Sequence, residues 1–315
     1  MDVRLVRVTI ALISISCNGP WNTYTAPMTN VRTCYKWSGL TKRIPMKIAV
    51  IGGTHGNEPV GIEVMKYLKQ NKPKGLLHEY ECFLGNPRAY EEGKRYIDTD
   101  LNRSFGKNGE RKGYEGDQSA ELVKKIEGKF DFILDLHTTT SNMGLTLLLN
   151  NDHENTRNAA AYLKELMPEI KIIEGMRLGE ECPYTNNMAQ AGLTVEVGPV
   201  ANNVLDSALI LATNKIVTAI LEWDFKGNID LTKVEHFKSV GEYKFPKAGQ
   251  WYVHPSLERA DFKELHPGDP VFINMEEEVL GFEYDKAIYP YFVNEAAYLN
   301  DNLVMTMGVK RDGFN

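Results

Sequence analysis

Cysteine is scarce in this sequence, and the few cysteines present are not paired. The 315 residues contain four, Cys17, Cys34, Cys82 and Cys182, which lie far apart with no CxxC spacing. This spacing excludes a disulfide scaffold and a zinc ribbon, both of which need closely grouped cysteines. A reducing compartment, the cytoplasm, is therefore the expected location.

Long apolar runs and low-complexity tracts are also absent. No run approaches the roughly 18 apolar residues that a membrane-spanning helix needs, so no membrane partner is expected. Hydrophobic residues still make up 43% of the chain. That content is ample for a packed core, in one large domain or in a large and a small one.

Positive charge is scarce beyond the first 45 residues. Residues 1–45 carry six basic residues and one acid, whereas the remainder carries 30 basic and 41 acidic residues. An acidic body argues against nucleic acid as the main partner, because phosphate binding needs a basic surface. An anionic substrate would need a local cluster of arginines within this negative protein.

Residues 1–45 do not resemble the start of a fold. Arg4 and Arg7 precede a short apolar run at 8–16, as in a signal-peptide core, and the low acidity also suits an organelle transit segment. We favour the interpretation that 1–45 is an extension outside the core, because residues 46–50 have the pattern of an opening strand. Targeting and an ordered extension are the alternatives.

From residue 46 to 226 the sequence alternates between strand and helix patterns. The apolar run 47–53 ends in two glycines and is followed by helical spacing over 59–70. Further helices are predicted at 118–126, 155–166 and 203–223, and further strands at 130–136, 144–149, 170–173 and 193–197. Such alternation predicts an α/β fold, a mostly parallel or mixed sheet with helices on both faces.

The pattern changes after about residue 226. Short strand-like runs follow, interrupted by several prolines and glycines, and no long helical pattern appears. We therefore predict a catalytic α/β domain over 46–226 and a smaller β-rich domain over 227–315.

Three side chains typical of zinc ligands follow predicted strands. His55 and Glu58 lie three residues apart just after the first strand, and His137 ends a later one. Catalytic zinc sites use three nitrogen or oxygen ligands and leave one position to water. The trio predicts one zinc ion per subunit. Each residue alone also has a structural interpretation: Glu58 as a helix N-terminal acid, the histidines as turn and strand-end residues.

Glu196 lies inside the apolar strand predicted at 193–197, which ends at Gly198 and Pro199. A carboxylate in such a strand costs desolvation energy unless it is paired or functional. We predict that it faces the ligand-binding edge of the sheet and acts as a general base toward zinc-bound water. A structural salt bridge is the alternative.

The segment 95–103 offers donors for an anionic substrate. Arg95, Asn102 and Arg103 can hold a carboxylate, and one arginine can polarise a scissile carbonyl. Asp98 and Asp100 would orient the guanidinium groups. Taken alone, the composition also fits a solvated charged loop.

Together, these residues resemble a known family. Seven motifs in register over residues 47 to 298 resemble the aspartoacylase/succinylglutamate desuccinylase family of zinc-carboxypeptidase-like enzymes. They are GGTHGNE (52–58), NPRA (86–89), RYIDxDLNR (95–103), DLHTTTSNMG (135–144), VEVGP (195–199), HPGDP (266–270) and FVNEAAY (292–298).

The resemblance implies roles for individual residues. It implies zinc on His55, Glu58 and His137, with Glu196 as the acid and base. It also implies Arg95 against the acyl carbonyl, Asn102 and Arg103 on the substrate carboxylate, and Tyr298 as a substrate contact. The β-rich domain that carries Tyr298 would partly cover the cleft, which excludes bulky peptides.

One departure from the family concerns the position about ten residues before Glu196. Aspartoacylases have an arginine there that holds the aspartate side-chain carboxylate, whereas this chain has Asn186 between Thr185 and Asn187. Arg177, further upstream, is the candidate substitute. A milder change is Thr138 after His137, where the animal enzymes have asparagine.

The expected activity is zinc-dependent hydrolysis of N-acetyl-L-aspartate to acetate and L-aspartate. The alternatives are deacylation of other N-acyl amino acids, neutral or aromatic as in the related aminoacylases, and a non-catalytic zinc or metabolite-binding protein. The expected partner is the small-molecule N-acyl amino acid, and the resemblance favours a homodimer.

Overall fold

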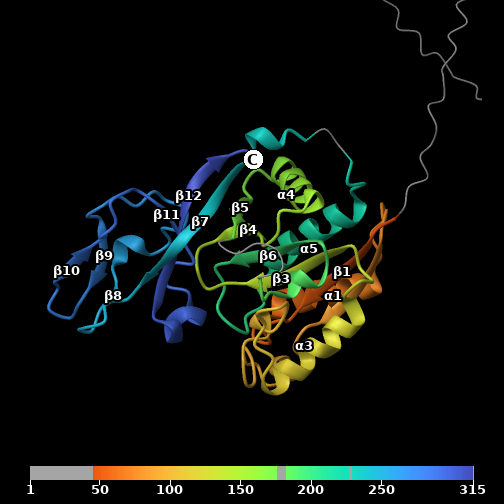
Figure 1. Ribbon diagram of the computed structural model, residues 1–315, viewed down its shortest axis with the longest axis horizontal. Helices are drawn as coiled ribbons and strands as arrows, with labels where there is room; N and C mark the ends of the chain where they lie inside the picture. The colour runs from red at the N-terminus through yellow and green to blue at the C-terminus, as the bar shows by residue number, and fades with distance from the viewer. Residues whose placement is uncertain (1–44, 176–181, 227–228, 315) are drawn as a thin grey trace, which may run out of the picture. The chain divides into compact units, whose positions relative to one another are not determined.

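The computed structural model describes residues 45–175, 182–226 and 229–314, which belong to one compact unit (Figure 1). Its α-helices are α1 (Pro59–Gln70), α2 (Pro87–Glu91), α3 (Gly113–Ile126), α4 (Glu154–Leu166) and α5 (Ser207–Glu222). Its strands are β1 (Lys47–Gly52), β2 (Glu79–Leu84), β3 (Phe132–Thr138), β4 (Gly144–Leu149), β5 (Lys171–Glu174), β6 (Ala191–Gly198), β7 (Glu235–Lys244), β8 (Tyr252–Val253), β9 (Pro270–Ile273), β10 (Val279–Gly281), β11 (Tyr289–Tyr291) and β12 (Leu303–Asp312).

A mixed sheet forms the centre of the fold. In the described residues its nine strands run in the order β11-β12-β7-β5-β4-β6-β3-β1-β2. Strands β2, β1, β3 and β6 are mutually parallel, whereas β4 runs antiparallel to β6. The carboxyl ends of β1, β3 and β6 therefore meet at one edge, which is where open α/β sheets bind ligands.

Helices cover both faces of this sheet, as predicted. In β1, Ile48 and Val50 face the core shared with α1, α4 and α5. Ala49 and Ile51 point the other way and pack with Leu122 of α3. Because alternate residues of β1 are buried on opposite faces, the strand is apolar throughout rather than alternating. The predicted fold class is confirmed.

The β-rich region after α5 contributes to two sheets. Strands β7, β11 and β12 extend the main sheet, and β8, β9 and β10 form a separate three-stranded sheet, visible in blue in Figure 1. Val271, Phe272, Val304 and Met305 are buried in the core between them. No α-helix follows α5 among the described residues.

Several elements differ from the sequence prediction: α2 was not predicted, and α3 begins at Gly113 rather than at 118. The pattern gave no strand at 79–84, yet β2 forms there as an edge strand whose glutamates alternate with half-buried residues. Helix α5 begins at Ser207 rather than at 203, because Asn203 has a left-handed φ of 62° and the Asp206 side chain caps the helix through Leu209 N.

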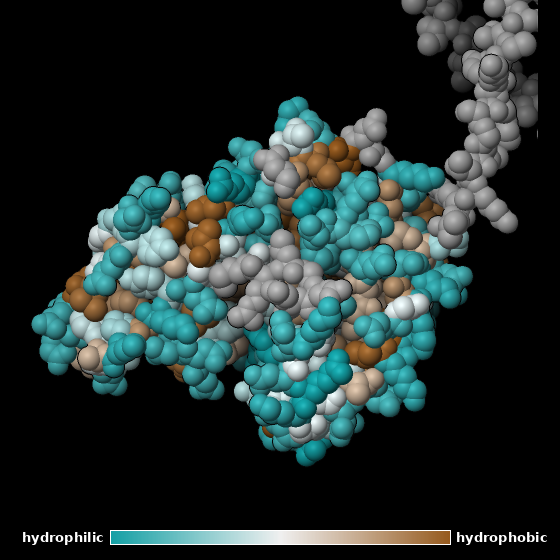
Figure 2. Space-filling view, in the orientation of Figure 1, coloured by the Kyte–Doolittle hydropathy of each residue, from teal (hydrophilic) through white to brown (hydrophobic). Residues whose placement is uncertain are grey.

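Hydrophilic residues cover most of the face shown in Figure 2, and the hydrophobic ones form small separate groups. Among the described residues, no helix combines the length and the apolar content that crossing a bilayer requires. The apolar faces of the helices pack against the sheet, where α1 buries Val60 and Val64 and α5 buries Ile216 and Ile220.

Candidate functional site

The predicted metal ligands come from neighbouring strand ends. His55 lies in the loop after β1, Glu58 occupies the N-cap position of α1, and His137 is the sixth residue of β3. Gly53 gives this loop its left-handed φ of 69°, which glycine adopts without strain. On the other side of β3, Glu196 of β6 lies in register with His137.

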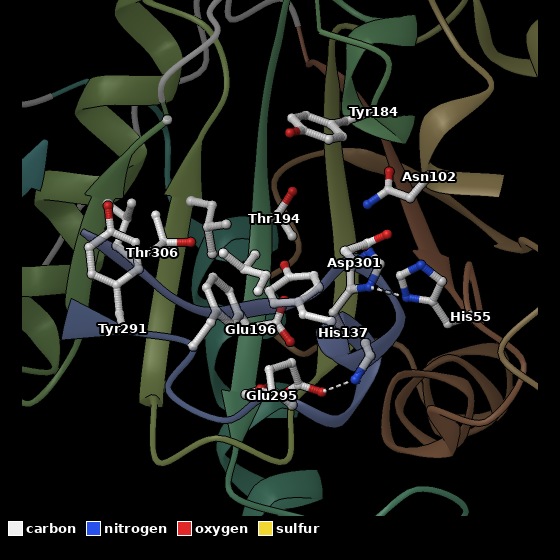
Figure 3. Close-up of a pocket in the computed structure, with 18 of the residues that line it drawn as sticks. His55, Asn102, His137, Tyr184, Thr194, Glu196, Tyr291, Glu295, Asp301 and Thr306 are labelled. Atoms are coloured by element: carbon white, nitrogen blue, oxygen red, sulfur yellow. Dashed lines mark hydrogen bonds between the residues drawn. The ribbon is translucent and has the colours of Figure 1, made fainter. Parts of the chain in front are cut away.

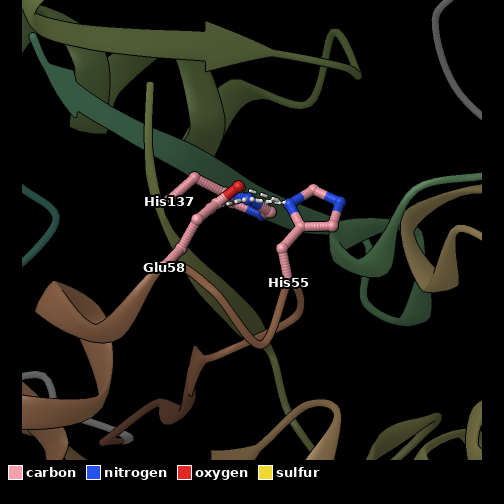
Figure 4. A group of neighbouring side chains, drawn as sticks. All are labelled: His55, Glu58 and His137. Carbon is pink, nitrogen blue, oxygen red and sulfur yellow. Dashed lines mark hydrogen bonds and ion pairs between the residues drawn. The ribbon is translucent and has the colours of Figure 1, made fainter. Parts of the chain in front are cut away.

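The structure brings His55, Glu58 and His137 into contact (Figure 4). His55 Nδ1 lies 2.8 Å from Glu58 Oε1, His137 Nδ1 lies 3.0 Å from Glu58 Oε2, and the two Nδ1 atoms are 3.2 Å apart. All three side chains are buried. Three potential ligand atoms thus converge on one point.

The outer nitrogen of each histidine contacts a further carboxylate. His55 Nε2 lies 3.0 Å from Asp100 Oδ1, and His137 Nε2 lies 2.8 Å from Asp135 Oδ2. An ionised carboxylate only accepts hydrogen bonds, so Nε2 carries the proton in both rings. In the neutral rings both Nδ1 lone pairs then face the Glu58 carboxylate. Lone pairs that face a carboxylate repel it unless a cation lies between them. A carboxylate on the outer nitrogen, as Asp100 and Asp135 provide here, is usual for metal-binding histidines.

The surroundings of Glu58 favour its ionised form. Burial acts to raise its pKa, but when the His55 and His137 rings are protonated their charges and hydrogen bonds outweigh burial and hold the pKa of Glu58 well below its usual range. Glu58 also accepts hydrogen bonds from Thr138 N at 3.1 Å and from Arg95 Nη1 at 3.1 Å. The carboxylate therefore stays ionised, as a metal ligand must.

Glu196 is the buried acid of this site. Burial raises its pKa to about 8, with the charges of Glu58 and Glu295 adding to that rise and His137 and Arg95 opposing it. A carboxyl group with a pKa near neutrality can both accept and return a proton. A cation bound beside it would lower this pKa and favour the proton-accepting form.

Arg95 is fixed at the edge of the cluster. Its Nη1 donates to Glu58 Oε1 and its Nη2 donates to Asp100 Oδ2, both at 3.1 Å. Asp100 is thus shared between Arg95 and His55, as the predicted orienting role requires. The prediction for Asp98 was wrong, because its carboxylate accepts from Tyr114 N at 2.8 Å at the start of α3.

Asn102 and Arg103 lie in the 3-10 helix η1 (Leu101–Arg103). Asn102 Oδ1 accepts from the backbone N and the hydroxyl of Thr185, and Figure 3 shows its amide nitrogen turned toward the cavity. The Arg103 guanidinium stacks over Tyr184, with 5.1 Å from its carbon to the ring centroid. Both side chains can therefore donate into the cavity.

Tyr298 reaches the site from the 3-10 helix η6 (Ala296–Asp301), which Glu295 anchors. Glu295 Oε2 accepts from the Thr139 hydroxyl, from Thr140 N at 2.9 Å and from Ser141 N at 3.2 Å. These contacts fasten the end of the chain to the loop after β3. Sequence reasoning missed Glu295 as a contact, although it lies in the FVNEAAY motif.

All the predicted site residues line one cavity of about 430 Å³ (Figure 3). These residues are His55, Glu58, Arg95, Asn102, Arg103, His137, Glu196 and Tyr298. Away from His55, Glu58 and His137 the wall includes Leu148, Ile173, Tyr291, Phe292 and Thr306. The charged side chains Glu242, Lys244 and Asp301 also line it, so charge is not confined to the end that holds the two histidines.

Asn186 is not on the surface but 1% exposed, behind the cavity wall. Its Nδ2 lies 3.3 Å from Thr194 Oγ1, and Asn150 Nδ2 lies 3.4 Å from the same oxygen. Thr194 and Asn150 line the cavity, so this part of the wall is polar and uncharged. Arg177, the candidate substitute, lies outside the described residues.

Sequence reasoning also missed Asp135. Its carboxylate joins His137 Nε2 to the Thr54 hydroxyl, 2.8 Å from each, and it is fully buried. A signal was present: Asp135 and His137 are two residues apart in a strand, so their side chains point to the same face.

Comparison with protein families gives two matches. The model described as "Succinylglutamate desuccinylase/Aspartoacylase catalytic domain" matches residues 45–223. The model described as "AstE/AspA barrel-sandwich hybrid domain" matches residues 232–310. The two matches together span almost all of the described chain.

Individual relatives agree with these matches. A "Probable aspartoacylase" from Acaryochloris marina is 33% identical, over 84% of this chain and 96% of its own. An "N-acyl-aromatic-L-amino acid amidohydrolase (carboxylate-forming)" from Homo sapiens is 32% identical, over 80% of this chain and 86% of its own. The crystal structure of murine aminoacylase 3 superposes with a TM-score of 0.76 at 30% identity, covering 85% of this chain and 96% of that one.

Proposed function

The chain belongs to the succinylglutamate desuccinylase/aspartoacylase family, as its seven motifs predicted, and on that premise we propose that it is a zinc-dependent amidohydrolase of N-acyl amino acids. N-acetyl-L-aspartate is the leading substrate, released as acetate and L-aspartate. The observation that carries the proposal is the position of Glu196, which lines the same cavity as the metal cluster and Arg95.

The donor set supports zinc, with one ion per subunit. Two imidazole nitrogens and one carboxylate are the ligands of many catalytic zinc sites. The candidate ligand atoms of the three side chains all lie within 4.8 Å of one another, so they could hold one ion together. Zinc, when bound, supplies Lewis-acid polarisation of the acyl carbonyl and lowers the pKa of a water molecule.

Glu196 moves the proton in this proposal. Its carboxylate takes a proton from the attacking water and then gives it to the nitrogen of the departing amino acid. Burial favours the protonated carboxyl group and so supports the second step, whereas a bound cation favours the ionised form that the first step needs. Burial also keeps bulk water away from Glu196, which is 8% exposed.

The donors of segment 95–103 orient the substrate. Arg95, fixed by Glu58 and Asp100, faces the position where the carbonyl oxygen gains negative charge. Asn102 and Arg103 offer an amide and a guanidinium to the α-carboxylate, as planar donors do. Tyr298, from η6, lines the same cavity and offers its side chain to the substrate.

The uncharged wall at Thr194 favours a second candidate substrate class. Asn186 takes the place of the arginine that aspartoacylases use for the aspartate side chain, and its amide is engaged with Thr194. N-acyl amino acids with neutral or aromatic side chains are therefore the alternative. One of the relatives carries such a substrate in its name.

The deciding experiment is a hydrolysis assay on acetyl-aspartate, acetyl-tyrosine and acetyl-leucine, with and without a zinc chelator. We expect chelation to abolish turnover and added zinc to restore it. An Asn186→Arg variant should raise kcat/KM for acetyl-aspartate relative to acetyl-tyrosine. Failure of every substrate with zinc bound would overturn the proposed activity.

Two further proposals concern the setting of the enzyme. The wide spacing of the cysteines supports the cytoplasm, and the family resemblance supports a homodimer. Light scattering of the purified chain tests the dimer, and cell fractionation tests the location.

A further inference from the structure

Glu115, in the first turn of α3, is a fully buried carboxylate that the proposed mechanism does not use. Its Oε1 accepts from Ile97 N at 2.7 Å and from Asn86 Nδ2 at 3.0 Å. Its Oε2 accepts from Asp98 N at 3.0 Å and from Thr99 N at 3.1 Å. Four donors thus surround one carboxylate, and three of them are consecutive backbone amides.

These donors keep Glu115 ionised in the interior. Burial acts to raise its pKa, but the hydrogen bonds from Ile97, Asn86, Asp98 and Thr99 outweigh it and lower the pKa. Hydrogen bonds to an ionised carboxylate are about twice as strong as those between neutral groups. Successive amides pointing at one anion form a rigid concave backbone. The segment 97–99 is therefore held by charge as well as by packing.

The held segment lies between the substrate-binding side chains. Arg95 comes two residues before it, Asp100 follows directly, and Asn102 and Arg103 lie in the short helix η1 that comes next. The geometry of all four depends on the backbone path of 97–99. Because a misplacement of about 1 Å can cost about 100-fold in rate, a carboxylate that fixes this path bears on catalysis without touching the substrate.

Side chains of residues 98 and 99 also bind the backbone at the start of α3. Asp98 Oδ2 accepts from Tyr114 N at 2.8 Å, and the Thr99 hydroxyl donates to Lys112 O at 3.3 Å. Gly113 has a φ of 56°, and a Cβ atom there would lie 2.4 Å from Asp98 Oδ2. The start of α3 is therefore shaped to receive this segment.

Hydrogen bonds also connect Glu115 to the loop after β1, which carries His55. Asn86, whose Nδ2 donates to Glu115, also donates its backbone N to Gly53 O at 2.8 Å. Arg95 O accepts from Gly56 N at 3.1 Å. Glu115 is thus two contacts away from the loop that carries His55.

We infer that Glu115 is a positioning residue for substrate binding, which sets Arg95, Asn102 and Arg103 by holding the amides of residues 97–99. The inference rests on the proposed function for its kinetic consequence. Glu115 differs in kind from the proposed catalytic groups, because it acts on the substrate only through the backbone of this segment.

The test compares Glu115→Gln with Glu121→Gln, a change on the exposed part of the same helix that removes only an ion pair with Lys125. In Glu115→Gln an amide N–H₂ faces either the Ile97 and Asn86 donors or those of Asp98 and Thr99. We expect KM to rise and kcat/KM to fall at least about 10-fold, with zinc content unchanged and Glu121→Gln at wild-type values. A merely structural role would lower the unfolding midpoint and leave KM of the folded enzyme unchanged, which overturns the inference.

A double-mutant comparison isolates the positioning effect. If Glu115 acts through Arg103, the Glu115→Gln change should cost several-fold less in an Arg103→Ala background than in the wild type. Equal fold-losses in both backgrounds would contradict the inference. Asp98→Asn, which weakens the attachment from the other side, replaces Glu115→Gln if that variant does not fold.

Amide hydrogen exchange separates this inference from the proposed function. Residues 97–99 should exchange at least about 10-fold faster in Glu115→Gln than in Glu121→Gln, whatever the substrate is. Unchanged exchange overturns the positioning role. A wild-type enzyme that hydrolyses no N-acyl amino acid overturns the proposed function alone, since the exchange measurement needs no substrate.

Discussion

The histidines of the cluster each pair with a carboxylate on the side away from the converging nitrogens. Asp135 holds His137 at 2.8 Å, and Asp100 holds His55 at 3.0 Å. These contacts fix both ring orientation and tautomer, so that the lone pairs meet before any ion arrives. The orientation of both rings is therefore set by carboxylates of the fold itself.

Removal of one such carboxylate should weaken metal binding. In Asp135→Asn a neutral amide replaces the charged acceptor of the His137 Nε2–H, which weakens the hydrogen bond that fixes this proton, and zinc affinity should fall about 10- to 100-fold. Competition with a chromophoric chelator measures this change. Asp131→Asn, an exposed change just before the same strand, is the control. Equal zinc affinity in the two variants would contradict the proposed role of Asp135.

Glu196→Gln tests the proton transfer itself. The amide cannot accept a proton, so kcat should fall by about 10² to 10⁴, whereas zinc should stay bound because Glu196 is not one of the three converging ligands. Stopped assays on the leading substrate and metal analysis of the same sample measure both. Appreciable turnover with full zinc content would remove Glu196 from the mechanism.

The sequence predicted the residues that line the cavity, but it did not predict the buried carboxylates that hold the surrounding loops. The eight predicted site residues share one cavity. His55, Glu58, His137 and Glu196 meet there because they lie at or just after strand ends at one sheet edge, whereas the other four come from loops and 3-10 helices. Glu115 and Glu295 escaped prediction because several of their partners are backbone amides 16 or more positions away. Backbone donors leave no mark in a sequence, since every residue except proline carries one.

At the scale of elements, the loop after β1 depends on a close approach to α2. A Cβ atom on Gly56 would lie 2.1 Å from the backbone carbon of Ala89 and 2.2 Å from Tyr90 N. Neither is the end of a flexible side chain, so the loop and the helix would have to separate. The loop that carries His55 therefore packs closely against α2, a short helix that has no predicted catalytic role.

Gly56→Ala should therefore displace His55 and lower both stability and zinc affinity. We expect a loss of about 1–3 kcal/mol in the free energy of unfolding, as for other overpacked positions, and a several-fold weaker zinc affinity. Urea unfolding and zinc titration measure the two. Gly241→Ala, where the new atom meets only the flexible end of Met307 at 3.1 Å, should change neither.

Element boundaries followed from the sequence where apolar periodicity was strong. Strand β2 was missed because it lies at the sheet edge, where Glu79 and Glu81 face solvent and only Phe83 is buried. The start of α5 was placed four residues early because Val204 and Leu205 have apolar side chains but are exposed. In both cases the polarity of the side chains does not match their burial in the fold, so the sequence pattern misplaces the element.

At the scale of the whole molecule, a second buried carboxylate joins the loop after β3 to the β-rich region. Asp261 accepts from Val293 N at 3.0 Å and from Asn142 N at 3.2 Å. Burial raises its pKa from 3.8 to about 6, with Glu295 adding to the rise and these backbone donors opposing it. The folded state therefore binds this proton more tightly than the unfolded state.

This contact makes stability depend on pH. Between pH 4 and 6 the folded chain holds a proton that the unfolded chain has lost, so the contribution of Asp261 to stability falls as pH rises. The loss is on the order of 2–3 kcal/mol. Asp261→Asn should remove it, so the difference in unfolding free energy between variant and wild type should shift toward the variant from pH 4 to 7. Urea unfolding at four pH values measures this, and parallel curves would contradict it.

The fold class followed from the alternation of patterns, but the extent of the sheet did not. The proposed boundary between residues 226 and 227 stays a prediction about sequence, and the main sheet crosses it through β5 and β7. Ile173 pairs with Phe237 there, and Glu174 pairs with Lys238. Short strands far apart in sequence carry no signal of such pairing, because many registers satisfy the same local pattern.

The continuity of the main sheet limits how the chain can be divided. A fragment that ends at residue 226 would lack β7, β11 and β12, and would present β5 to solvent with unpaired backbone groups. An open strand of this kind recruits other chains, so we expect the fragment to self-associate rather than to behave as a smaller hydrolase. The region after residue 226 thus has two roles: η6 supplies Tyr298 to the cavity, and β7 covers the edge of β5.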